Sequence, residues 1–141
     1  MIRESDYWMG RDEKYPQELT GEIEANAADL LPKVNNLLAA LGWPDPEVRS
    51  GWRPKEVNDA TSNSAANSKH LTGQAVDLAD DNRELATAIM RETDVLAQCG
   101  LYMEDCRWTP TWVHLQSVPP HSGKRIFIPS NTPPIAQPVL A

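Results

Sequence analysis

The sequence has few cysteines, no long apolar run and no signal-like N-terminus. The chain has two cysteines, and without an export signal we expect Cys99 and Cys106 to be reduced thiols; the alternative is a disulfide between them, because they flank a predicted turn and short strand. No apolar stretch approaches the roughly 20 residues that span a bilayer, and we expect no membrane segment. Residues 1–6 are charged and lack the apolar core of a signal peptide, which predicts synthesis in the cytoplasm without export.

Basic charge is also scarce. The formal net charge of −7 at pH 7 argues against nucleic acid as a partner, because phosphate binding requires a basic surface. It leaves room for a polymeric, partly anionic substrate that is bound in a local pocket.

Phenylalanine is nearly absent, whereas tryptophan is common. One phenylalanine accompanies five tryptophans, and the indole N–H suits the wall of a groove as well as a core. Trp52, Trp108 and Trp112 are therefore candidates either for a groove wall or for the core. Tyr7 and Trp8 are expected to anchor the polar N-terminal segment onto the body of the protein.

Helical patterns alternate irregularly with short apolar segments. This predicts an α+β fold, with a small antiparallel sheet packed against helices, in a single domain over residues 1–141. We expect a monomer. A brief helix is expected at 55–60, and the expected strands cover residues 48–52, 74–78, 101–103, 111–117 and 126–128. The proline-rich tail, residues 129–141, is expected to lie extended on the surface.

Two longer helices are expected from their caps and apolar spacing. The first begins after its N-cap Thr20, and Pro32 is expected to kink or split it. The second is expected to follow Asp81, which forms a capping-box pattern with Glu84, and to end at Gly100.

Residues 68–77, Ser-Lys-His-Leu-Thr-Gly-Gln-Ala-Val-Asp, and residues 112–116, Trp-Val-His-Leu-Gln, carry two histidines and one carboxylate. A catalytic zinc site uses three such protein ligands and leaves the fourth position open. His70 and Asp77 are too far apart for one helical turn, and the glycine between them suits a loop that turns into a strand. If His114 lies on a neighbouring strand, the three side chains converge. The alternative is structural: a loop cap, a carboxylate bonded to a backbone amide and a core histidine.

The pattern Ser-x-His-x-x-Gly-x-Ala-x-Asp, followed downstream by Trp-x-His, resembles the zinc D-Ala-D-Ala carboxypeptidases and L-alanyl-D-glutamate endopeptidases of peptidoglycan. Those enzymes share their fold with the Hedgehog signalling domain. Residues 50–53, Ser-Gly-Trp-Arg, are similar to the family's Ser-Gly-Tyr-Arg element, and the resemblance covers roughly residues 48–118. It implies that His70, Asp77 and His114 bind zinc.

The resemblance also suggests residues that contact substrate. It implies that Arg53 recognises a terminal carboxylate through its bidentate guanidinium, with Ser68 as a nearby hydrogen-bond donor. The alternative is a solvated arginine and a serine that merely shapes a turn. Gln116 lies two residues beyond His114 and on a strand faces the same side, so it either touches substrate or packs beneath the site.

The catalytic base departs from the family pattern. Family members usually place an acid three residues before the last histidine, where this chain has Thr111. The nearest acids are Glu104 and Asp105. A hairpin through residues 107–110 would bring Glu104 beside the metal, and its longer side chain favours it over Asp105. The alternative is an exposed acidic turn.

These features together predict a zinc metallopeptidase that hydrolyses a peptide bond in peptidoglycan stem peptides, with Glu104 moving the proton. Residues 104–116 further resemble the small phage-encoded members, which implies an endolysin that reaches the cell wall after lysis or with a helper. One alternative is a zinc-binding interaction module of the same fold without catalysis. Another is a phage structural component with an incidental metal site.

Overall fold

The structure, a computed structural model, describes residues 1–61 and 67–129. The predicted C-terminal tail therefore lies outside the described residues, apart from its first position. The helices are α1 (Glu4–Trp8), α2 (Arg11–Lys14), α3 (Gly21–Ala40), α4 (Lys55–Ala60), α5 (Glu84–Arg91) and α6 (Asp94–Cys99). The strands are β1 (Val48–Ser50), β2 (Ala75–Ala79), β3 (Tyr102–Glu104), β4 (Trp112–Gln116) and β5 (Ile126–Phe127). The predicted α+β class is confirmed.

The five strands form one sheet in the order β1-β2-β4-β3-β5. The first three pairings are antiparallel, as predicted, whereas β5 pairs parallel to β3. The difference arises because the chain reverses after β4 and passes β3 before it pairs, so β5 runs in the direction of β3. The centre of the sheet, β2 and β4, has a strand on either side.

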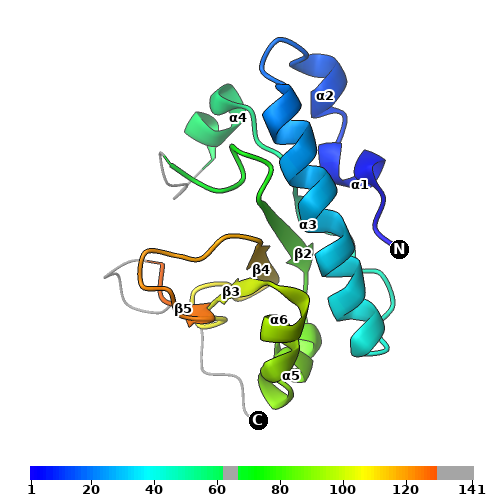
Figure 1. Cartoon of the computed structure of the whole chain (residues 1–141), viewed down its shortest axis with the longest axis vertical. Helices are drawn as coiled ribbons and strands as arrows, with labels where there is room; N and C mark the ends of the chain where they lie inside the picture. Colours follow the sequence, from blue (N-terminus) through cyan, green and yellow to red (C-terminus); the bar gives the residue numbers. More distant parts are fainter. Residues whose placement is uncertain (62–66, 130–141) are drawn as a thin grey trace.

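Helix α3 runs along the molecule beside the sheet (Figure 1). Thr20 caps it as predicted, because its Oγ accepts a hydrogen bond of 3.2 Å from the Ile23 N–H. Pro32 does not split it: the helix is continuous on both sides. Packing of the amphipathic face outweighs the one lost backbone hydrogen bond. The buried face comprises Ala27, Leu30, Leu31, Val34, Leu37 and Leu38.

The predicted helix after Asp81 differs in two respects. It is divided into α5 and α6, and its N-terminus is held by Asp80 rather than Asp81. The two carboxylate oxygens of Asp80 accept hydrogen bonds of 2.8 and 2.9 Å from the N–H groups of Leu85 and Ala86. Asp81 instead forms an ion pair of 2.6 Å with Arg49. Asp80 takes the capping role because it is buried at the end of β2, where its carboxylate meets the first turn of α5.

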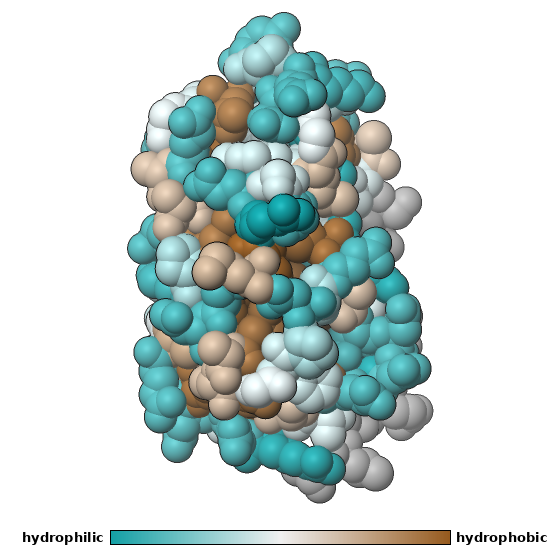
Figure 2. All heavy atoms as spheres, turned by 90° about the vertical axis from the view of Figure 1, so that its right-hand side faces the viewer, coloured by the Kyte–Doolittle hydropathy of each residue, from teal (hydrophilic) through white to brown (hydrophobic). Residues whose placement is uncertain are grey.

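The N-terminal segment packs against the strands, as its aromatic residues predict. Tyr7 is fully buried and its hydroxyl donates a hydrogen bond of 2.9 Å to the Ala75 carbonyl. Trp8 packs edge-on against Trp52, with ring centroids 6.0 Å apart. Trp52 is 1% exposed and therefore belongs to the core rather than to a groove wall. On the side of the molecule where α1 lies, hydrophobic side chains show between hydrophilic ones (Figure 2).

Two other expectations concern free thiols and membrane helices. Cys99 and Cys106 are free, as expected. Among the described residues, no helix is both long enough and apolar enough to cross a bilayer.

The segment that follows β1 passes so close to α1 that only glycine fits at position 51. A Cβ atom there would lie 1.9 Å from the Tyr7 carbonyl oxygen. We therefore expect Gly51→Ala to lower the free energy of unfolding by roughly 1–3 kcal/mol, the usual cost of overpacking, in urea titrations. The control is Gly21→Ala, because a Cβ at Gly21 meets no atom within 4 Å. Equal stability of the two variants would contradict the close approach.

Candidate metal centre

The register of the sheet places polar side chains in one row. Ser50 pairs with Asp77 between β1 and β2, and Asp77 pairs with His114 between β2 and β4. The β3–β4 register pairs Met103 with Leu115, and its continuation sets Glu104 across from His114. Directly opposed residues lie on the same face of a sheet, so these four side chains share a face.

His70 joins this row from the loop before β2. Its ring Nδ1 lies 2.8 Å from the Gly51 carbonyl oxygen, and its own carbonyl accepts a hydrogen bond of 3.0 Å from the Arg53 N–H. The turn back into β2 uses Gly73 at a φ of +75°, where a Cβ would lie 2.8 Å from the Ile23 carbonyl oxygen. His70 is 2% exposed, so loop and strand hold the ring firmly in place.

The three predicted ligands converge. One donor atom from each of His70, Asp77 and His114 lies within 4.8 Å of the other two. Asp77 Oδ1 is 3.2 Å from His70 Nε2 and 2.9 Å from His114 Nδ1. These separations are close to the roughly 3.3 Å between neighbouring ligands around a tetrahedral zinc ion with bonds of about 2 Å.

The donor set fits a divalent cation in its chemistry as well. The Gly51 carbonyl can only accept, so His70 Nδ1 carries the ring proton and Nε2 presents a lone pair toward Asp77. Two imidazoles and one carboxylate, each already oriented by a second hydrogen bond, form the type of three-ligand set found in catalytic zinc sites. We infer that these residues are able to hold zinc.

The charges of the site are strongly coupled. Burial alone raises the pKa of Asp77, but the neighbouring imidazoles of His70 and His114 outweigh it and hold the pKa well below its usual range. Burial lowers the pKa of His70. For His114, burial is outweighed by the hydrogen bond and charge of Asp77, which raise the pKa to about 9. Without metal, the site therefore holds an ionised Asp77 against a protonated His114 at neutral pH.

Arg53 lies against the ligand set. Its Nη2 is 3.3 Å from Asp77 Oδ2, its Nε donates to Ser50 Oγ at 2.9 Å, and its Nη1 donates to Asn58 Oδ1 at 3.3 Å. Three of its five N–H groups are thus engaged by described residues. The guanidinium also fixes the second oxygen of Asp77. Asn58, 1% exposed on α4, is a contact that no sequence pattern indicated.

The two candidate bases have different surroundings. Asp105 is engaged by Arg107, which donates to its carboxylate at 2.8 and 3.0 Å, and this pairing holds its pKa below the usual range despite partial burial. Glu104 is on the face of His114, and within the described part of the chain its side chain has no hydrogen-bond partner. Burial raises the pKa of Glu104, while the charge of His114 acts in the opposite direction. The structure therefore brings Glu104, but not Asp105, to the ligand set.

The remaining predicted contacts lie close to the histidines. Ser68 Oγ accepts a hydrogen bond of 3.2 Å from the His70 N–H and so shapes the ligand loop. Gln116 is 4% exposed, and its Oε1 lies 2.9 Å from His114 Nε2. His121, the third histidine, is exposed in the turn between β4 and β5.

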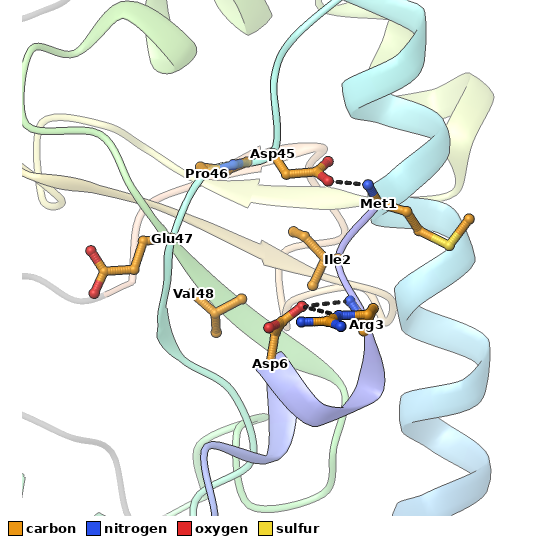
Figure 3. A pocket seen from close by; sticks show the side chains of 8 residues that line it. All are labelled: Met1, Ile2, Arg3, Asp6, Asp45, Pro46, Glu47 and Val48. Atoms are coloured by element: carbon orange, nitrogen blue, oxygen red, sulfur yellow. Dashed lines mark hydrogen bonds and ion pairs between the residues drawn. The ribbon is translucent and has the colours of Figure 1, made fainter.

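A separate hollow lies next to the N-terminus and contains none of these residues. It is lined by Met1, Ile2, Arg3, Asp6, Asp45, Pro46, Glu47 and Val48 (Figure 3). Four of its five charged groups form two pairs, the Met1 ammonium with Asp45 and Arg3 with Asp6, and the fifth is Glu47. We therefore assign no chemistry to this hollow.

A comparison with protein families identifies a family that matches most of the chain. The family profile described as Peptidase M15 matches residues 11–116, a stretch that runs from the start of α2 to the end of β4 and includes the whole ligand set. No curated protein and no solved structure gives a significant match.

The raised pKa of His114 leads to a prediction about protons. At pH 7 the metal-free ring is protonated because its pKa is about 9, and it must lose that proton to coordinate through Nδ1. Zinc binding at pH 7 is therefore expected to release about one proton, with affinity falling as the pH decreases below 9. Calorimetric titrations in two buffers of different ionisation enthalpy measure this. His121→Ala is the matched control, and a binding enthalpy that is independent of the buffer would contradict the expectation.

Proposed function

The chain belongs to the peptidase M15 family, and we propose that it is a zinc metallopeptidase that hydrolyses a peptide bond in the stem peptides of peptidoglycan. The observation that carries the proposal is the convergence of His70, Asp77 and His114 within 4.8 Å, beside a half-buried acid, Glu104. Three protein ligands leave a fourth position for water or substrate, which is the arrangement of catalytic rather than structural zinc sites.

The ion and the chain's own residues have separate tasks. When bound, zinc supplies a Lewis acid that acidifies water and polarises the scissile carbonyl. Glu104 accepts the proton of the attacking water and delivers it to the leaving amine, so that hydrolysis yields a carboxylate and an amine. Its burial supports this role, because a raised pKa brings a carboxylate closer to the operating pH.

The position of this acid also accounts for the departure from the family pattern. The residue three before His114 is Thr111, which is exposed just ahead of β4. Glu104 reaches His114 from the neighbouring strand β3 instead, across the β3–β4 register. An acid that is missing from the usual place in the sequence is thus supplied by the adjacent strand.

Arg53 is the residue that we propose recognises the substrate. A guanidinium recognises a carboxylate or a carbonyl oxygen through its parallel N–H groups, and stem peptides carry carboxylates at their ends and side chains. The guanidinium is held by Ser50 and Asn58, so it is positioned before substrate arrives. We propose that the site acts on the cell wall, as the resemblance to phage-encoded peptidases implies.

A second candidate is a zinc-binding interaction module that has lost catalysis. Thr111 is the observation that favours it, because the acid of the family pattern is absent there. Muropeptide digestion followed by mass spectrometry separates the two functions. Release of D-Ala or cleavage of a stem peptide would support the peptidase. Intact peptides in the presence of zinc-loaded protein would support the interaction module.

Replacement of Glu104 tests the proton shuttle. We expect Glu104→Gln to lower the rate of muropeptide hydrolysis by about 10²–10⁴-fold, because the amide cannot accept the proton of water. Zinc content should be unchanged, since Glu104 is not among the ligands. Asp105→Asn is the matched control and should retain most of the activity. A Glu104→Gln variant as active as the wild type would exclude Glu104 as the base.

Metal analysis tests the ligand set directly. Purified protein is expected to contain about one zinc per chain, and His70→Ala and His114→Ala are expected to lose it because two ligands rarely retain the ion. His121→Ala, which alters the exposed third histidine, should keep the metal. Wild-type protein that stays metal-free after incubation with zinc would refute the proposed function.

A further inference from the structure

We propose that Gln116 is a positioning residue that selects the tautomer of His114, so that the Nδ1 lone pair faces Asp77 and the metal position. The inference deepens the proposed function and rests on the proposed zinc site. It gives Gln116 a role other than substrate contact or simple packing. Its tests do not depend on hydrolysis.

The geometry begins with the strand. Gln116 and His114 are two positions apart on β4, so their side chains leave the same face of the sheet. The two ends of the Gln116 amide have different partners. Its Oε1 lies 2.9 Å from His114 Nε2, and its Nε2 donates a hydrogen bond of 2.9 Å to the Val118 carbonyl.

These two contacts determine where the protons are. The Val118 carbonyl can only accept, so the NH₂ end of the amide must face it. The end that remains for His114 is the amide oxygen, which also can only accept. His114 Nε2 must therefore carry a proton, and in the neutral ring the lone pair is then on Nδ1, 2.9 Å from Asp77 Oδ1.

His70 is held in the opposite tautomer. A backbone carbonyl, that of Gly51, fixes the proton of His70 on Nδ1 and leaves Nε2 for the metal. In His114 a side chain performs the same task on the other nitrogen. The His114 ring is held further by edge contacts with His70 and Phe127, at centroid distances of 5.2 and 6.1 Å. Each imidazole thus presents one determined nitrogen to Asp77.

The burial of Gln116 argues against a direct role in substrate binding. The residue is 4% exposed, and both ends of its amide are engaged within the protein. Hydrogen bonds that orient a metal-binding histidine and raise its basicity typically contribute 10- to 100-fold to metal affinity. Gln116 has the contacts of such an orienting group.

Gln116→Met is the informative variant, because methionine keeps the length and packing of glutamine but removes the acceptor. We expect its zinc dissociation constant, measured by chelator competition, to rise about 10- to 100-fold. Gln98→Met, at an exposed site on α6, is the matched control. Gln116→Glu retains the oxygen acceptor for His114 Nε2 but loses the donor to the Val118 carbonyl, so its affinity should lie between those of Gln116→Met and the wild type. If Gln116→Met binds zinc as tightly as the wild type does, Gln116 only fills space and the inference is wrong.

A second measurement needs no variant. In ¹⁵N-histidine spectra of the zinc-loaded wild type, we expect His70 to be protonated on Nδ1 and His114 on Nε2, with exposed His121 as the reference. Coordination of His114 through Nε2 would overturn the inference even if Gln116→Met failed to fold. Failure of the wild type to bind zinc would instead refute the proposed function, so the two failures are distinguishable.

Discussion

The buried carboxylate of Asp77 is the group around which the site is organised. It is 8% exposed, and a buried charge is costly unless opposite charges and hydrogen bonds compensate for it. The compensation comes from the protonated His114 on β4 and from Arg53 after β1, while the neutral His70 ring in the loop before β2 lies 3.2 Å from the same carboxylate. Because all three side chains contact Asp77, the loop and both neighbouring strands meet β2 at this point.

The N-terminal segment packs against the residues that position His70. Residues 50–53 lie between α1 and the His70 loop, with Gly51 close to the Tyr7 carbonyl and its own carbonyl on His70 Nδ1. Arg11 donates a hydrogen bond of 2.9 Å to the Trp52 carbonyl, and Trp52 donates to the Leu71 carbonyl. The position of His70 therefore depends on contacts far from it in the sequence, and the first residues of the chain take part in building the site.

The site combines two histidines in fixed orientations with an acid that has no hydrogen-bond partner among the described residues. The histidines are oriented by acceptors that are themselves fixed, one a backbone carbonyl and the other an amide held by Val118. Glu104, by contrast, has no hydrogen-bond partner among the described residues and is free to exchange a proton. Fixed donor atoms next to an acid that has no partner among the described residues fit the metal-assisted hydrolysis that we propose.

The sequence by itself determined the features that depend on local spacing. The cap at Thr20 and the apolar face of α3 follow from helical periodicity, and the two histidines with Asp77 follow from a motif of ligand types. What depends on long-range contacts was decided only by the tertiary structure. Two adjacent acids, Asp80 and Asp81, have the same capping chemistry, and burial at the end of β2 selects the first.

The direction of β5 and the proximity of Glu104 to His114 likewise depend on strand register, which sequence spacing does not specify. Two further contacts depend on burial: Arg53 donates to Asn58, and His114 contacts the Gln116 amide. They form because polar groups that folding removes from water are paired within the protein. The sequence therefore specifies which residue types are available as metal ligands. Packing in the tertiary structure determines how these ligands are oriented and which acid lies beside them.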